Sequence, residues 1–141
     1  MRRVVLDTNV LVSGVLSAQG APGKILALAR SKELDLLFSR QTLAEAFRVL
    51  DEPRLQAYLK KRSLSSDQAK NFIKRLARFS VITPGKLGIP PVEADPSDTM
   101  FLVCAVEGQA DFIVSGDHHL TDLGSYEGIP IVAPARFLEL A

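Results

Sequence analysis

The sequence of 141 residues predicts an α/β fold with a central, mostly parallel sheet of about five short strands flanked by helices. Short apolar runs, often β-branched, recur along the chain, and segments with helical periodicity separate them. Strands that alternate with helices pair in parallel, because each helix returns the chain to the same end of the sheet. The length suits one domain, so we expect residues 1–141 to form a single one.

The first half of the chain supplies three of these strands, expected at residues 3–6, 36–38 and 80–82. The helices of this half are expected at residues 22–33, 40–50, 54–62 and 66–79. Ser39 is placed to cap the second of them, and Ser65 with Gln68 forms a capping box at the start of the fourth. A loop rich in Gly and Pro follows at 84–91.

The second half continues the alternation. Asp95 followed by Pro96 indicates a helix start, with Asp95 as the cap, and this helix should reach Gly108. The remaining strands are expected at 112–114 and 131–132, and the remaining helices at 117–123 and 134–140.

Composition is that of an ordinary globular protein, with 47% hydrophobic and 23% charged residues. No apolar run approaches the ~20 residues that a membrane-spanning helix needs. Arg2 and Arg3 precede an apolar stretch, but Asp7 and Asn9 interrupt it, which argues against a secretory signal. Cys104 is the only cysteine and cannot form an internal disulfide. We therefore expect a reduced, cytoplasmic protein without a membrane partner.

Charge is divided unevenly along the chain. Residues 1–92 carry 16 Lys and Arg against 7 acids, a net charge of +9, whereas residues 93–141 carry 1 Arg against 9 acids, a net charge of −8. The division is either an accident of surface composition or a basic surface for a polyanion beside an acidic pocket for cations.

Three acids can converge where a parallel sheet binds its ligands, beyond the carboxyl ends of the strands. Asp7 follows the first strand, Asp117 follows the fourth, and Asp98 lies in the first turn of a helix. Each also has a structural explanation: the first two can cap the helices after them, and Asp98 can pair with Asp95. A fourth acid, Glu45, lies opposite the apolar residues of its helix, so a helical wheel places it in solvent.

Three segments resemble the PIN-domain nucleases: VVLDTNVLVSG at 4–14, AEAFRVL at 44–50 and DPSDTMFLVCAVEGQADFIVSGDHHL at 95–120. The similarity is greatest to the VapC-like toxins of PIN-type toxin–antitoxin pairs. By position, it implies that four acids bind metal: Asp7, Glu45, Asp98 and Asp117. It also implies polar residues that support them: Asn9, Ser115 and Thr8.

The resemblance implies a Mg²⁺- or Mn²⁺-dependent endoribonuclease that hydrolyses phosphodiester bonds of single-stranded RNA. It also implies an antitoxin protein as partner and a homodimer. His119 stands where the family often has a further Asp, which bears on how many ions bind, because Mg²⁺ prefers oxygen ligands. The alternative is that His119 is a plain surface residue.

Phosphate contacts are expected from two basic helices. The residues are Lys60, Lys61, Arg62, Lys74, Arg75 and Arg78. They can equally be the solvated faces of their helices. With no Trp and two Tyr, a broad aromatic platform for stacking bases is not expected.

Other enzyme classes lack the residues they need. A haloacid-dehalogenase-like phosphatase requires a second Asp two residues after the first, where this chain has Asn9. Neither a P-loop nor a G-x-G-x-x-G is present, which disfavours nucleotide-binding enzymes. Two alternatives stay open: a PIN nuclease of RNA maturation or quality control, and a non-catalytic RNA-binding PIN module.

Overall fold

The computed structural model describes residues 1–88 and 96–141, in which six strands form one sheet in the order β3-β2-β1-β4-β6-β5. The strands are β1 (Arg2–Leu6), β2 (Leu34–Ser39), β3 (Val81–Thr83), β4 (Phe112–Val114), β5 (Ser125–Tyr126) and β6 (Ile129–Val132). Every neighbouring pair is parallel except β5 with β6, so the expected mostly parallel sheet is confirmed.

Strand β5 is the one the sequence did not predict. It has only two residues, too few for a periodic pattern, and it pairs with β6 through a tight turn at Glu127 and Gly128. Both turn residues have positive φ, 50° and 78°, as the mirror-image hairpin turns require. Gly128, which readily adopts positive φ, was therefore the available signal.

The helices of the described residues are α1 (Thr8–Leu16), α2 (Gly20–Arg30), α3 (Arg40–Leu50), α4 (Pro53–Lys61), α5 (Ser66–Arg78), α6 (Thr99–Glu107), α7 (His118–Thr121) and α8 (Pro134–Leu140), with a 3-10 turn at Pro96–Asp98. The predicted caps at Ser39 and Ser65 are confirmed, and each completes a capping box. Asp7 caps helix α1, as the structural explanation for this residue predicted. The predicted cap at Asp95 lies outside the described residues, as do residues 89–91 of the expected loop.

Alternation along the strands builds two hydrophobic cores. Val4 and Leu6 of β1 point to one face of the sheet, where they join residues of α1, α2, α3, α5 and α8. Val5 points to the other face, where it packs with residues of α6 and α7 such as Leu102 and Leu120. Helices therefore cover both faces, as a parallel sheet requires.

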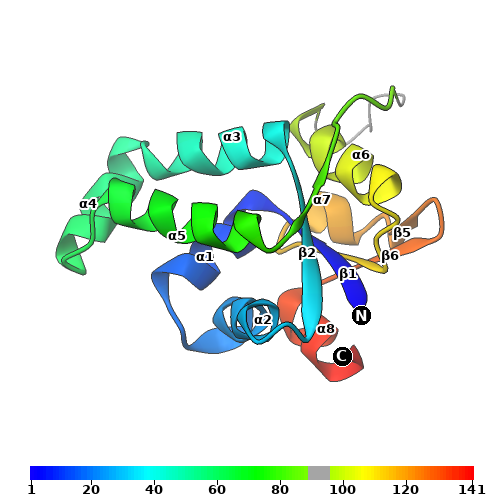
Figure 1. The fold of residues 1–141 in the computed structure, drawn as a ribbon, viewed down its shortest axis with the longest axis horizontal. Coiled ribbons are helices and arrows are strands. Elements are labelled where there is room, and N and C mark those ends of the chain that lie inside the picture. The colour runs from blue at the N-terminus through cyan, green and yellow to red at the C-terminus, as the bar shows by residue number, and fades with distance from the viewer. Residues whose placement is uncertain (89–95) are drawn as a thin grey trace.

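Helices α3, α4 and α5 form an arm that leads away from the sheet (Figure 1). Helix α3 leaves the end of β2, α4 lies at the far end of the arm, and α5 returns beside α3 (Figure 1). The two chain ends meet on another side, where the guanidinium of Arg2 donates a hydrogen bond to the carbonyl of Leu140 at 2.7 Å. In the described parts of the chain no single helix is long and apolar enough to span a membrane; α1 and α2 reach that length and composition only together, across an 86° bend.

Candidate functional site

A cleft of about 740 Å³ opens at the carboxyl ends of β1 and β4, and all four predicted acids line it. Asp7 and Asp117 come from the segments after these two neighbouring strands, Asp98 from the start of α6, and Glu45 from α3. The backbone N–H of Asp7 donates to the carbonyl of Val114 at 3.0 Å, which extends the pairing of β1 with β4 to the edge of the cleft. The topology thus gathers carboxylates that are up to 110 residues apart.

Asp7 is buried in the floor of the cleft, with 5% of its surface exposed. One carboxylate oxygen caps α1 by accepting the N–H of Val10 at 2.9 Å, and the other accepts the hydroxyl of Ser115 at 2.5 Å. Burial raises the pKa of Asp7; hydrogen bonds from Ser115, Val10 and Gly116 oppose the rise, and the charge of Asp117 adds to it. The neutral donors around Asp7 therefore compensate its charge only in part.

Ser115 connects the two acids at the strand ends. Its hydroxyl donates to Asp7 and accepts the backbone N–H of Asp117 at 2.9 Å, and the side chain is fully buried. Asp117 itself caps α7 by accepting the N–H of His119 at 2.9 Å. Asp7 and Asp117 thus both cap helices and line the cleft, so the structural explanation and the proposed site do not exclude each other. A carboxylate offers about four lone-pair sites, so the hydrogen bonds from Val10, Ser115 and Gly116 leave a site on Asp7 for a further ligand.

Three further predicted residues lie in the cleft. Asp98 is buried at the start of α6, where its side chain makes no capping hydrogen bond to that helix. Thr8 is also buried, and its hydroxyl oxygen makes no hydrogen bond within the described residues. Asn9 is exposed at the rim. His119, by contrast, is exposed and does not line the cleft, as expected of a surface residue.

The helical-wheel expectation for Glu45 is wrong. Its side chain is 24% exposed and lines the cleft rather than facing bulk solvent. The wheel took the apolar residues of α3 as one inward face, but α3 contacts β2, α1, α5 and α6, so it is enclosed on several sides. The deeply buried row is Thr42, Ala46 and Leu50, and Glu45 lies in the next row, beside the cleft.

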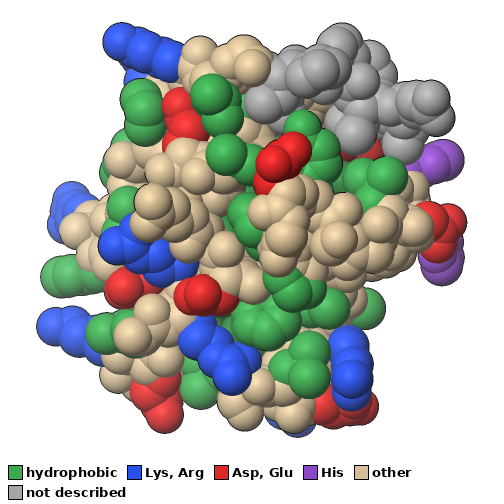
Figure 2. Space-filling model, turned by 90° about the vertical axis from the view of Figure 1, so that its right-hand side faces the viewer, with side chains coloured by type: hydrophobic (Ala, Val, Ile, Leu, Met, Phe, Trp, Pro, Cys, Tyr) green, Lys and Arg blue, Asp and Glu red, His purple; other side chains and the backbone are tan. Residues whose placement is uncertain are grey.

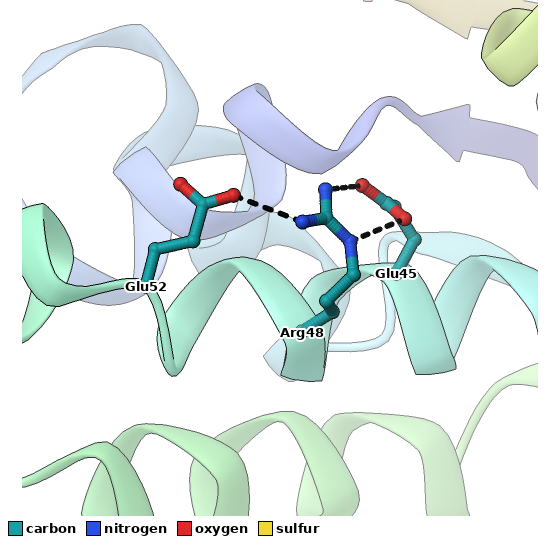
Figure 3. A network of polar contacts seen from close by, with 3 residues as sticks. All are labelled: Glu45, Arg48 and Glu52. Atoms are coloured by element: carbon teal, nitrogen blue, oxygen red, sulfur yellow. Dashed lines mark hydrogen bonds and ion pairs between the residues drawn. The ribbon is translucent and has the colours of Figure 1, made fainter.

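Arg48 is a cleft residue that the sequence analysis missed. Its guanidinium forks between two acids, donating to both oxygens of Glu45 at 2.5 and 3.1 Å and to Glu52 at 3.1 Å (Figure 3). These hydrogen bonds and the charge of Glu45 raise the pKa of Arg48, so it remains a cation. The available signal was spacing, because residues 45, 48 and 52 follow one another at intervals of three and four along one side of a helix.

The donor set suits a hard divalent cation, because carboxylate oxygens and the unpartnered Thr8 hydroxyl share one cleft. Within the residues that the structure describes, however, no three acidic, histidine or cysteine side chains lie close enough together to hold one ion. The ion pair with Arg48 already occupies both oxygens of Glu45. The side chains therefore have the right chemistry for a metal ion and line one cleft, but they would have to move closer together to bind it.

The predicted basic residues do not line the acidic cleft. Arg62 lies over the ring of Tyr58, which does line it, with 4.6 Å between the guanidinium carbon and the ring centroid. Lys74 lies over Phe47 of α3, also outside the cleft. On the face turned away from α4, acidic and basic side chains are scattered and histidine side chains project at one edge (Figure 2). The basic excess of the first half is therefore not gathered on that face.

Comparison with known proteins bears on the family. Residues 3–119 match the PIN domain, and this stretch contains all four predicted acids. The chain is also similar to an uncharacterized protein, MJ1680, of Methanocaldococcus jannaschii: the two are 32% identical over 127 residues, which covers 86% of this chain and 74% of the archaeal protein. The resemblance seen in the motifs is confirmed at the level of the family. The chain belongs to the PIN domain family, whose members are generally nucleases that use divalent metal ions and bind RNA.

Proposed function

We propose that this protein is an endoribonuclease that hydrolyses single-stranded RNA with the help of Mg²⁺ or Mn²⁺. The observation that carries the proposal is that Asp7, Glu45, Asp98 and Asp117, from four separate segments, line one cleft. Like charges gathered in this way repel each other unless a cation neutralises them, and Asp7 is already buried beside Asp117. A structural role alone gains nothing from that arrangement.

The proposed metal-binding residues are the four acids, with the Thr8 hydroxyl beside them. When bound, Mg²⁺ or Mn²⁺ would lower the pKa of a water and neutralise charge on the phosphate. The chain's own residues do the positioning. Ser115 holds Asp7 and the backbone of Asp117 through one hydroxyl, so both carboxylates stay at the strand ends. The α1 cap fixes the second oxygen of Asp7.

Glu45 is the member of the set that must change partner. Arg48 neutralises it now, and a divalent cation on Glu45 would compete with that guanidinium. In that case Arg48 would present its permanent positive charge in the same cleft, where it would suit a substrate phosphate.

The test is cleavage of a labelled single-stranded RNA with and without Mg²⁺ or Mn²⁺, comparing the wild type with Asp117→Asn. The matched control is Asp122→Asn, which removes the same charge just beyond α7, outside the cleft. We expect cleavage by the wild type and the control only, and none in excess EDTA. Equal activity in EDTA would refute the metal dependence, and wild-type activity in Asp117→Asn would refute the proposed site. Metal-independent RNA binding without cleavage would instead indicate a non-catalytic RNA-binding module.

The biological setting is a second part of the proposal. Similarity of the motifs to VapC-like toxins supports a toxin that a small antitoxin protein neutralises. Expression should then arrest growth, and a co-encoded partner should relieve the arrest. Normal growth with an active enzyme would favour a nuclease of RNA maturation or quality control. Light scattering on the purified protein would test the proposed homodimer.

A further inference from the structure

The cleft continues beyond the acids to a second end, formed by α4. Arg54, Leu55 and Tyr58 line this end. Arg54 and Leu55 precede Tyr58 by four and three residues, which puts both beside it on one side of the helix. This end and the acidic end belong to the same cleft, so a chain molecule bound at the acids has α4 along its path.

The α4 end combines an aromatic ring with positive charge. Tyr58 is 42% exposed, and the guanidinium of Arg62 lies 4.6 Å from its ring centroid. Arg54, Tyr58 and Arg62 follow one another at intervals of four, so the ring lies between two cations along one stripe. Within residues 1–88 and 96–141, neither arginine forms an ion pair with an acid. Their charge is therefore available to an anionic ligand.

The acid nearest to this end already has a cation beside it, which it shares with Glu45. Glu52 immediately precedes α4 and lines the cleft, and the guanidinium of Arg48 binds it at 3.1 Å (Figure 3). Asp51, beside it in sequence, pairs with Lys70 at 2.7 Å. Both ion pairs reduce the repulsion that an incoming phosphate would otherwise meet from the start of α4.

We propose that the α4 end of the cleft is a nucleotide-binding subsite, in which an unpaired RNA base stacks on the ring face of Tyr58 opposite Arg62 and the backbone phosphate binds Arg54. The inference rests on the proposed ribonuclease function, because it places the subsite beside the reacting phosphate. A base can stack on a tyrosine only when it is unpaired, which selects single strands. Guanidinium groups bind phosphate through paired hydrogen bonds, which suits the arginines on either side of the ring.

The test measures binding of a fluorescein-labelled ten-nucleotide single-stranded RNA by anisotropy, with Ca²⁺ in place of Mg²⁺ to suppress cleavage. The variants are Tyr58→Ala, Tyr58→Phe, Arg54→Gln and, as a control on α8 outside the cleft, Arg136→Gln. We expect Tyr58→Ala to weaken binding by about 5- to 150-fold, the range for loss of one stacked base, and Tyr58→Phe to retain it. Arg54→Gln should lower the dependence of log Kd on log salt by about 0.7, whereas Arg136→Gln should leave it unchanged.

Three outcomes would overturn the subsite. These are wild-type binding by Tyr58→Ala, an equal loss in Tyr58→Phe, and an equal dependence on Tyr58 when the probe is duplex RNA. Because the side chain is exposed, Tyr58→Ala should keep the wild-type melting temperature. If it does not, RNA binding by Arg54→Gln and Tyr58→Phe still tests the subsite. A wild type that cleaves RNA while Tyr58→Ala binds normally refutes the subsite alone. A wild type that neither binds nor cleaves RNA refutes the proposed function.

Discussion

The acidic part of the cleft holds its carboxylates in two different ways, at a strand end formed by β1 and β4 and at a helix end formed by α3. At the strand end Asp7 is 5% exposed and meets only neutral donors, and burial raises its pKa. At the helix end Glu45 is 24% exposed and is paired with Arg48. The strand end therefore holds a negative charge that no cation offsets, whereas at the helix end one guanidinium offsets part of the charge of Glu45 and Glu52. A divalent cation gains most from the first and must compete for the second.

The largest expected effect is on the cleavage rate, and it differs between the strand end and the helix end. Asp7→Asn should lower the cleavage rate by at least about 100-fold, because it removes the charge least compensated by the protein. Glu45→Gln should cost less, about 10-fold, because part of its charge already serves Arg48. Single-turnover rates at saturating RNA and Mg²⁺ measure both. A larger loss in Glu45→Gln would reverse the ranking of the two ends.

The next effect is on stability, and its sign follows from the pKa of Asp7. Because that pKa is raised, the folded protein retains a proton that the unfolded chain has released, so stability falls as pH rises from the ordinary Asp pKa through the raised one. In EDTA at pH 7, Asp7→Asn should melt at a higher temperature than the wild type. The difference should vanish below the ordinary Asp pKa. A less stable variant at pH 7 would show that Asp7 supports the fold more than it strains it.

Saturating Mg²⁺ should reverse that order. An ion at about 100 times its Kd stabilises the folded state by about 2.7 kcal/mol, which for this length raises the melting temperature by about 5–10 °C. We expect the shift in the wild type and in Asp122→Asn, but not in Asp7→Asn. A shift in all three would place the bound ion elsewhere.

A smaller effect tests the competition at the helix end. Arg48→Gln leaves Glu45 without its counter-ion, so Mg²⁺ affinity should rise by about 2- to 5-fold, the range of an exposed ion pair. Arg54→Gln is the matched control, because it removes the same charge from the same cleft without touching Glu45. Isothermal titration would measure both. Equal gains in the two variants would attribute the change to net charge alone.

The smallest effect compares Asp7 with Glu107, an acid outside the cleft. Burial raises the pKa of Glu107, but backbone N–H groups of Lys86, Gly85 and Leu87 outweigh it, and the pKa is lowered. Its stabilisation is present above the ordinary Glu pKa and is lost as pH falls below it. Glu107→Gln should cost about 1 kcal/mol at pH 7, because the amide oxygen still accepts some of these bonds in a solvent-screened site. Thermal melting at pH 7 and pH 3 measures it, and an unchanged stability at pH 7 would contradict it.

Much of the fold follows from local patterns. The β-branched run before Asp7 forms β1, the capping box at Ser65 begins α5, and Pro134 begins α8 where expected. These signals act over a few residues, so tertiary packing had no competing preference to overcome. Strand β5 was not predicted because its two residues are held by pairing with β6 and have no periodic pattern of their own.

The candidate site divides along the same line. The sequence by itself determined that Asp7 and Asp117 each follow a strand, because the apolar runs mark where those strands end. Only the tertiary structure decided that these two strands, β1 and β4, are neighbours, since strand order depends on how the connecting helices pack. Only the tertiary structure decided that Glu45 faces the cleft, since the buried side of a helix depends on how many neighbours enclose it. It likewise placed Arg48 and Tyr58 beside the acids, because the path of the α3–α4 arm depends on packing between elements distant in sequence.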